Sequence, residues 1–495
     1  MTRRWTPWLF LVGVLLGLGV VIDSSAQTSK DEAGQPPSPP QKPPAPPPSP
    51  SEYNVQVKKA LTTLMHQIES AAVKVVDYDA LKAHYFAPKG GGGLSSEEVL
   101  NSMPIYQKGM ETLKGRRFKH ALSNRIVTKE EFAKYLDNGL IALTWVERSA
   151  DLQDKFKYFR LIPSTYNLVE GLRPVLEDDL TVLYDFHTKD MLFLEWKTVS
   201  ELFVHLPRVL ATVLVDQHYQ LKDLAEQWRG NNDARYALDA LLQGDGIFSQ
   251  VEYGFVNRKV EVTNFEVAEQ IAAELEERMR LYHQQYAIPM SVLAHYFYPK
   301  LYGVRFFEYG RRYYPQERLF SVYSRLPNSM EKVIHPEKHF NKRHKDNPTR
   351  LIFSAEVENA LAERKWRLVE RTVLGEFFFQ LLLMDAIGQK DALNAASGWD
   401  GDLMAIYARS ETERGLVLFS VWDSIEDASE AYAGFQKSFL GFYRGTKYQV
   451  LHNSTELLHL SLADTEVKLK RKGRYVLVLQ GFPGLLTAQL EAAFN

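Results

Sequence analysis

The chain has 495 residues, of which 45% are hydrophobic and 24% charged, with a formal net charge of -2 and no cysteine. This length allows two or three domains, and the composition is ordinary for a globular protein. The near-zero charge gives no electrostatic case for a nucleic-acid partner. The absence of cysteine excludes disulfides, thiolate zinc sites, iron–sulfur clusters, a cysteine nucleophile and a lipid-modified N-terminal cysteine.

The first 26 residues have the pattern of an export signal. Arg3 and Arg4 precede an apolar run from Trp8 to Ile22, and small residues end the segment at Ala26. The run is shorter than the roughly 20 residues that a membrane-spanning helix needs. We therefore expect a secreted or periplasmic protein; the alternative is an uncleaved segment that anchors the protein to the membrane, facing the periplasm or the exterior.

Residues 27–52 are rich in proline and predict a disordered linker in extended polyproline conformation. The folded protein is expected to begin near Tyr53. We predict a first domain over residues 53–390 and a C-terminal subdomain over residues 391–495.

The first predicted domain contains mostly helical patterns. Thr128 as N-cap with Glu131 three residues later predicts a capped helix that ends near Gly139. Alternation over Thr181–Trp196 predicts a β-hairpin. Further helices are predicted over about Pro207–Trp228, Asp233–Val251 and residues 265–286.

The tail has a different pattern, with two strands over Asp402–Ala408 and Gly415–Trp422 and a helix capped by Ser424. A buried strand over Arg474–Phe482 and a last helix from about Leu485 follow. This order predicts a small antiparallel α+β subdomain with its helices on one face of the sheet.

The segment LPRVLATVLVDQHYQL, from Leu206 to Leu221, raises the question of a metal site. Zincins need two histidines at i and i+4 on one helix, a glutamate base after the first, and a third ligand from a second helix. The segment resembles a family of secreted bacterial gluzincin-like metallopeptidases, whose helix reads His-Glu-Leu-x-His-Ala-Leu-Gln-Asp-Gln-His-Phe/Tyr-Asp-Leu. Aligned on the shared Asp-Gln-His, the histidines fall on Arg208 and Thr212 and the base on Val209.

Other segments extend this resemblance, in order, from about Leu113 to the C-terminus. In ARYALDALLQGDG, which resembles the helix with the third zinc ligand, the ligand glutamate is replaced by Gln243. The remaining matching segments are LKGRRFKHALSNRIVTKEEFAKYL, LYDFHTKDMLFL, YPKLYGVRF, IHPEKHF, LGEFFFQLLL and AASGWDGDLMAIY. The resemblance implies an α+β fold with a zincin-like helical core and a β-hairpin or sheet, followed by the C-terminal antiparallel α+β subdomain.

The four replaced residues predict a degenerate site. Arg208 has no lone pair to offer a metal, Val209 cannot accept a proton, Thr212 is a poor ligand, and Gln243 offers only an amide oxygen. We expect that zinc is lost, that no cofactor or metal is bound, and that no catalysis by the family mechanism takes place. Pro207 favours a helix that begins at the former ligand position.

Six polar residues are candidates for lining the degenerate cleft: Asp216, His218, Asp245, His335, Glu376 and Asp402. A buried Arg208 needs carboxylate partners, and Asp245, Glu376 and Asp402 are the candidates; the alternative is that Arg208 faces solvent at a frayed helix start. His218 and Asp216 form either an acid–base pair or, as we favour, contacts that fasten the helix to its neighbours. His335 and His339 form either a metal face or, as we favour because Pro336 lies between them, a hydrogen-bonded turn.

Three classes of function remain open. The favoured one is a non-catalytic, exported metallopeptidase relative that binds a peptide or protein partner through the old cleft, by accepting an added strand. The alternatives are an active hydrolase with a relocated site, for example His218 with Glu376 or His335, and an envelope structural protein. Zinc content and peptide turnover separate the first two classes, and crosslinking in the envelope identifies the third.

Overall fold

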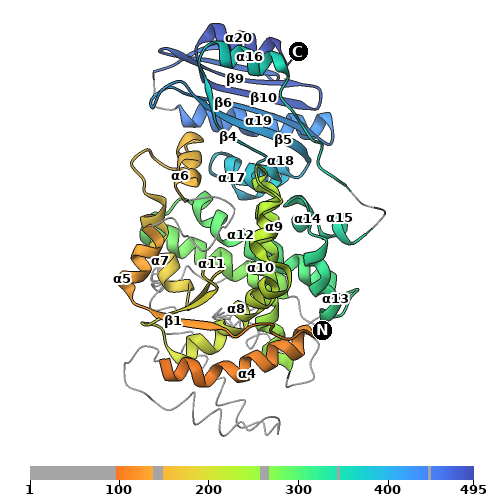
Figure 1. Cartoon of the computed structure of the whole chain (residues 1–495). Coiled ribbons are helices and arrows are strands. Elements are labelled where there is room, and N and C mark those ends of the chain that lie inside the picture. The colour runs from red at the N-terminus through yellow and green to blue at the C-terminus, as the bar shows by residue number, and fades with distance from the viewer. Residues whose placement is uncertain are drawn as a thin grey trace, which may run out of the picture.

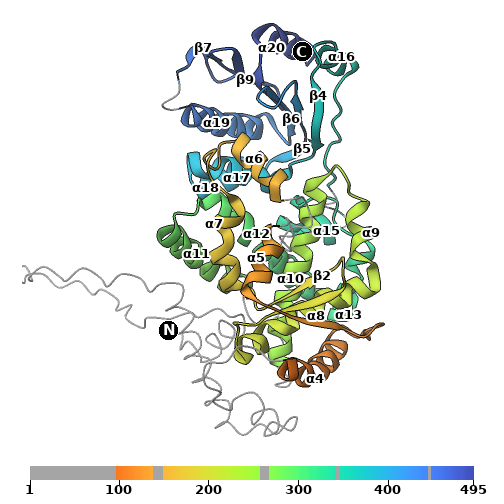
Figure 2. The ribbon, with the colours of Figure 1, turned by 60° about the vertical axis from the view of Figure 1, so that its left-hand side comes forward.

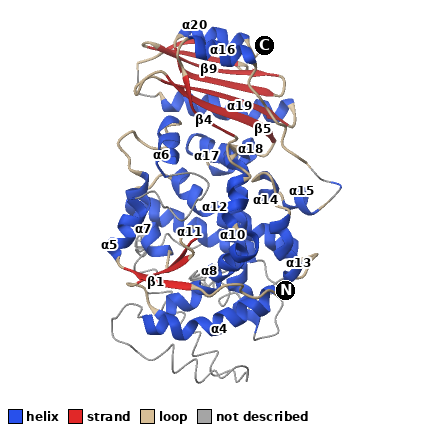
Figure 3. Ribbon diagram, viewed as in Figure 1, coloured by secondary structure: helices blue, strands red, loops and turns tan. Residues whose placement is uncertain are grey.

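The computed structural model describes residues 96–137, 149–256, 267–341, 343, 346–443 and 447–494. The predicted export signal (1–26), the proline-rich linker (27–52), the start of the first predicted domain and Gly139 lie outside these residues. The described chain is α+β, as expected: a largely helical body with a small sheet, and a large antiparallel sheet near the C-terminus (Figure 1, Figure 3). Within these ranges no helix combines the length and hydrophobicity needed to span a lipid bilayer.

The helical body contains most of the helices. They are α4 (Ser96–Lys114), α5 (Lys129–Asp137), α6 (Ser149–Tyr158), α7 (Leu168–Asp179), α8 (Val199–Tyr219), α9 (Leu221–Glu226), α10 (Asn232–Val256), α11 (Val267–Tyr286), α12 (Met290–Arg311), α13 (Gln316–Leu319), η2 (Phe320–Ser324), α14 (Glu331–Ile334) and α15 (Pro336–Phe340). Helix α12 is buried along most of its length and packs against α10, so these two helices form the centre of the body.

The small sheet contains β1 (Ser123–Val127), β2 (Val182–Asp185) and β3 (Asp190–Leu194), in the order β1-β3-β2. The predicted hairpin is confirmed, since β2 and β3 pair antiparallel. Strand β1, which the sequence analysis did not predict, joins β3 in parallel. The capping box of α5 is also confirmed: Glu131 N donates to Thr128 Oγ1 at 3.1 Å, and Thr128 N donates to Glu131 Oε2 at 2.9 Å.

The predicted start of the helix over about Pro207–Trp228 is wrong. Helix α8 begins at Val199, because Thr198 and Glu201 form a reciprocal capping box that satisfies the first N–H groups. Pro207 therefore lies inside the helix, where it is buried, and Arg208 lies in the middle of α8 and not at a frayed end.

Two glycines of the segment QGDG allow α10 to approach its neighbours closely. A Cβ on Gly244 would lie 2.0 Å from the backbone of Gly303 on α12, and a Cβ on Gly246 would lie 2.8 Å from Cγ of Arg208 on α8. The spacing of small residues in this segment thus has a packing role, because larger side chains would push the helices apart.

The C-terminal sheet has seven strands in the order β4-β5-β6-β10-β9-β8-β7. The strands are β4 (Arg367–Thr372), β5 (Trp399–Ala408), β6 (Arg414–Trp422), β7 (Gln449–Asn453), β8 (Leu457–Leu462), β9 (Thr465–Lys472) and β10 (Tyr475–Phe482); the helices are α16 (Ala355–Glu363), α17 (Gly375–Ile387), α18 (Gln389–Ala396), α19 (Ile425–Phe442) and α20 (Gly484–Ala492). The sequence predicted β5, β6, β10, α19 and α20, but not β4, β7, β8 or β9.

The expectation that helices cover one face of this sheet is wrong. Helices α16 and α20 pack on one face, whereas α17 and α19 pack on the other, toward the helical body (Figure 1, Figure 2). Alternate residues of β10 explain this. Leu477 and Leu479 pack on the face with α16 and α20, whereas Val476 and Val478 pack on the face with α17 and α19. Strand β4, which lies before residue 391, pairs with β5 of this sheet.

Candidate functional site

Helix α8 presents the replaced positions on two of its sides. Arg208 and Thr212, four residues apart, share one face of the helix and are half-buried. Val209 packs with an apolar cluster that α8 forms with α4, which includes Leu206 and Leu210. The position of the expected general base therefore contributes to packing.

The structure brings two of the four replaced positions into direct contact. Arg208 Nη2 on α8 donates a hydrogen bond of 2.6 Å to Gln243 Oε1 on α10, and both side chains are half-buried. The absence of a side chain at Gly246, one turn from Gln243, gives the stem of Arg208 room to lie against α10. A guanidinium bonded to a primary amide does not fit a zinc ion, because the guanidinium offers no lone pair and repels a cation.

Beside this pair lies a buried group of charges that the sequence analysis missed. Asp179, at the end of α7, is 2.6 Å from Lys300 Nζ and 2.7 Å from Arg278 Nη2, and accepts a hydrogen bond of 2.6 Å from Tyr296. Burial alone would raise the pKa of this carboxyl group, but the charges of Lys300, Arg278 and Arg208 hold it well below its ordinary value. We call Asp179, Arg278, Tyr296 and Lys300 the Asp179 cluster.

Asp239 is a second buried carboxyl group in this region. It lies one turn before Gln243 on α10, and burial raises its pKa to about 7, although a hydrogen bond from Gln243 opposes the shift. Burial also lowers the pKa of Lys300 to about 7, against the attraction of Asp179. Burial thus disfavours the charged form of both Asp239 and Lys300.

The three carboxylates expected to neutralise Arg208 have other partners. Asp245 pairs with Lys114 and accepts a hydrogen bond from Tyr323. Asp402 accepts hydrogen bonds from the backbone N–H groups of Leu374 and Gly375 and from Trp399 Nε1. Glu376 contacts His335 and Gln380. The carboxylates whose pKa values respond to Arg208 are Asp179 and Asp239. The expected partners are wrong, because other donors, some of them on the same helix or strand, occupy Asp245, Glu376 and Asp402.

Two other candidates of α8 fasten the end of this helix. Asp216 is buried, accepts a hydrogen bond from Tyr184 of the hairpin, and is 2.7 Å from Lys189 Nζ. His218 Nε2 is 2.9 Å from the carbonyl oxygen of Arg117, and its ring lies edge-on to Phe320. These contacts agree with the structural interpretation of the Asp-Gln-His segment.

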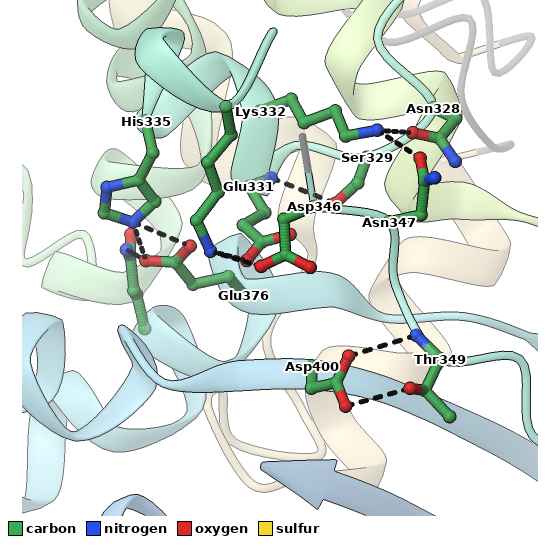
Figure 4. A network of polar contacts seen from close by, with 12 residues as sticks. Asn328, Ser329, Glu331, Lys332, His335, Asp346, Asn347, Thr349, Glu376 and Asp400 are labelled. Carbon is green, nitrogen blue, oxygen red and sulfur yellow. Dashed lines mark hydrogen bonds and ion pairs between the residues drawn. The ribbon is translucent and has the colours of Figure 1, made fainter. Parts of the chain in front are cut away.

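His335 and Glu376 form the one pair among the six cleft candidates that the described residues bring together (Figure 4). His335 Nε2 lies 3.2 Å from the buried carboxylate, while the side chain of His335 stays 30% exposed. Burial raises the pKa of Glu376, and the hydrogen bond with Glu376 raises the pKa of His335 against its own burial. His339, in contrast, packs against Phe306, so the two histidines of HPEKH have separate partners.

Further polar contacts lie between this pair and the C-terminal sheet (Figure 4). Lys338 Nζ lies 2.5 Å from the buried Glu331 and 3.0 Å from Asp346, and Thr349 donates through its hydroxyl to Asp400 on β5 at 2.9 Å (Figure 4). Lys332 donates to Asn328 and Asn347. These contacts attach the segment that follows α15 to both the helical body and the sheet. Among the described residues, no group of three or more His, Asp or Glu side chains is arranged to hold a metal ion.

The missed residues did carry a signal in the sequence. Lys300 stands in the aromatic run YFYPKLYGVRFF, and Asp239 in the apolar run YALDALL. A single charge within an apolar helix needs a buried partner. Lys300 and Asp239 are charges of this kind, as is Glu376 in the apolar helix α17.

Comparison with known proteins finds one family model that matches part of the chain. A domain of unknown function, DUF8575, matches residues 365–490, which contain β4 to β10 and helices α17 to α19. No curated protein and no solved structure matches the chain. Arg208 and Gln243 lie outside the matched segment, whereas Glu376 and Asp402 lie within it.

Proposed function

We propose that this chain is an exported, non-catalytic relative of gluzincin-type metallopeptidases, and that it binds a peptide or protein partner at the surface around Arg208 and Gln243. The hydrogen bond between these two side chains supports the proposal most directly. The resemblance places zinc ligands at both positions, and here the two replacements bond to each other. Both remain half-buried and therefore reachable from solvent.

The charges around this pair suggest what kind of group it binds. The charge of Arg208 acts on Asp179 and Lys300, whereas Arg278 faces the carboxylates of Asp179, Glu274 and Asp178. A guanidinium at a half-buried position is a good donor to a carboxylate or a backbone carbonyl. An extended peptide offers both groups, which makes it the partner that we favour.

Metal analysis tests the loss of the zinc site. The variant with Arg208→His, Val209→Glu, Thr212→His and Gln243→Glu restores the ligands and the base, and we expect it to bind one zinc ion per chain, with the wild type binding none. A matched control keeps Gln243 and changes only the other three positions; it should bind zinc more weakly because it lacks the third ligand. Stoichiometric zinc in the purified wild type would overturn the proposal.

A peptide library tests the binding site. Peptides from a denatured-protein digest are equilibrated with the full chain, and retention is compared for the wild type, Arg208→Ala and Gln243→Ala. We expect both variants to lose the retained set. The control is Arg229→Ala, since the side chain of Arg229 is 81% exposed and pairs with Glu226, outside the Arg208–Gln243 contact. Equal retention by all four proteins would contradict a site at Arg208 and Gln243.

A second candidate function rests on the His335–Glu376 pair, because a histidine beside a buried carboxylate is a common acid–base arrangement. In this alternative the chain is a hydrolase whose site has moved from α8 to the segment around α15. Turnover of the same peptides by the wild type, abolished by Glu376→Gln, would favour it over the binding protein.

A further inference from the structure

The C-terminal sheet contains a pocket that is remote from α8. It has a volume of about 530 Å³ and is lined by Leu351, Phe419, Lys470, Lys472, Gly473, Arg474, Tyr475, Leu477, Glu491 and Phe494. We call it the β9–β10 pocket, since it lies at the turn between these two strands. Its volume is within the range of roughly 300–1,000 Å³ that is usual for small-molecule sites.

The strand register explains the floor of the pocket. Leu477 of β10 is paired with Phe419 of β6 on one side and with Lys470 of β9 on the other, and Tyr475 is paired with Lys472. Residues directly opposite each other in antiparallel strands share one face of the sheet. All five side chains therefore belong to the face that α20 covers.

The pocket is open because α20 covers only part of this face. The helix packs over Leu479 and Phe482 with Leu486 and Leu490, and it ends at Ala492. Phe494, just after the helix, closes one side of the pocket against Phe419, with ring centroids 4.9 Å apart. The ends of β9 and β10 are left to form the opening.

An aromatic platform lies at this opening. The rings of Phe419 and Tyr475 are nearly parallel, with an interplanar angle of 11° and centroids 5.5 Å apart. Tyr475 is 41% exposed although it is a large aromatic residue. An exposed ring that is held in place by a second ring offers a flat surface on which a planar ligand can stack.

The lining is cationic. It contains Lys470, Lys472 and Arg474 but only one carboxylate, Glu491. Glu491 accepts from Lys468 and Lys470 at 2.6 and 2.8 Å, and these hydrogen bonds lower its pKa although burial acts in the opposite direction. Glu491 is thus held by two lysines. The exposed residues of the lining include Lys472 and Arg474, and Arg474 Nη1 donates to the carbonyl oxygens of Trp422 and Asp423.

We propose that the β9–β10 pocket binds a small planar aromatic anion, whose ring stacks on Tyr475 and whose carboxylate, sulfonate or phosphate group lies between Lys472 and Arg474. The platform selects a flat ring, and the positive rim selects an anionic substituent. The proposal is independent of the function proposed for the surface around Arg208, since the two sites share no residue.

The test uses the full chain and three naphthalene probes of similar shape: 2-naphthoate, neutral 2-naphthalenemethanol and cationic 2-naphthylmethylammonium. Calorimetric titration should show saturable binding of one naphthoate per chain, weaker binding of the neutral probe and weakest binding of the cation. Lys472→Ala and Arg474→Ala should each weaken naphthoate binding roughly twofold to fivefold, as expected for exposed ion pairs, and leave the neutral probe unchanged. Tyr475→Ala should weaken both of these probes roughly threefold to tenfold.

Matched controls are Lys390→Ala on α18 and Tyr313→Ala after α12, which are an exposed lysine and an exposed tyrosine outside the pocket. Both should bind naphthoate as the wild type does. If Tyr475→Ala does not fold, Tyr475→Leu keeps the apolar bulk and removes the ring. Binding that does not saturate, equal affinity for the anionic and neutral probes, or unchanged affinity in the Lys472 and Arg474 variants would each overturn the proposal.

Discussion

Lys300 Nζ lies 2.6 Å from Asp179 Oδ2, 121 residues away in the sequence, and both side chains are almost fully buried. The other oxygen of Asp179 pairs with Arg278 on α11. One carboxylate thus connects α7, α11 and α12 beside the α8–α10 contact. Because Asp179, Tyr296 and Lys300 are buried and Arg278 is only 12% exposed, the effect of each on stability depends on the presence of the others.

Substitution of Asp179 by Asn should destabilise the protein strongly. It leaves Lys300 and Arg278 buried without their shared carboxylate, which costs about 3–5 kcal/mol in the free energy of unfolding, as urea denaturation will measure. The control is Asp154→Asn, since Asp154 is 55% exposed and 3.3 Å from Arg414; it should change the free energy by less than about 1 kcal/mol. Similar losses in the two variants would argue against a cooperative cluster.

Asp239→Asn should change the pH dependence of stability. The pKa of Asp239 is about 7 in the folded chain and near 3.8 when unfolded, so the folded state holds this proton more tightly. Its contribution to stability is fully present below about pH 4 and is lost as the pH rises through 7. Thermal unfolding from pH 4 to pH 8 should show the wild type losing stability relative to the variant. Parallel curves would mean that Asp239 is ionised in the folded protein.

Asp402 and Asp400 on β5 provide a matched pair for the contact between the sheet and α17. Asp402 accepts from two N–H groups at the start of α17 and from the indole of Trp399, and Asp402→Ala would leave these buried donors without an acceptor. We expect a loss of about 2–4 kcal/mol in the free energy of unfolding. Asp400→Ala removes only the exposed contact with Thr349 and should cost about 1 kcal/mol or less. The reverse order of the two losses would contradict this assignment.

Gly303→Ala and Gly441→Ala should have opposite effects. A Cβ on Gly303 would lie 1.8 Å from the carbonyl oxygen of Ala240, so α10 and α12 would have to separate, at a cost of about 1–3 kcal/mol or more. A Cβ on Gly441 in α19 meets nothing within 4 Å, and alanine there should raise the stability by about 0.5–1 kcal/mol, because glycine is a poor helix former. The melting temperatures of the two variants are compared with that of the wild type. An unchanged melting temperature for Gly303→Ala would show that the contact between α10 and α12 can relax.

Features that depend on near neighbours could be predicted from the sequence. Thr128 with Glu131, and Ser424 with Asp427, are three residues apart, and both caps form as expected. The β2–β3 hairpin was predictable for the same reason, since a short turn brings its strands together. The start of α8 was misjudged because Pro207 was placed in the first turn, and the capping box of Thr198 and Glu201, which has the same local spacing, was overlooked.

The partners of the charged residues were decided by the tertiary structure. The sequence showed that Arg208 could not be a zinc ligand, but not that it would bond to Gln243 or lie beside Asp179 and Asp239. Likewise, the apolar run of β10 predicted a buried strand, but not that helices would cover both of its faces. The physical reason is range: a cap or a turn acts over three or four residues, whereas a buried charge pairs with whichever opposite charge the packing of distant helices brings within reach.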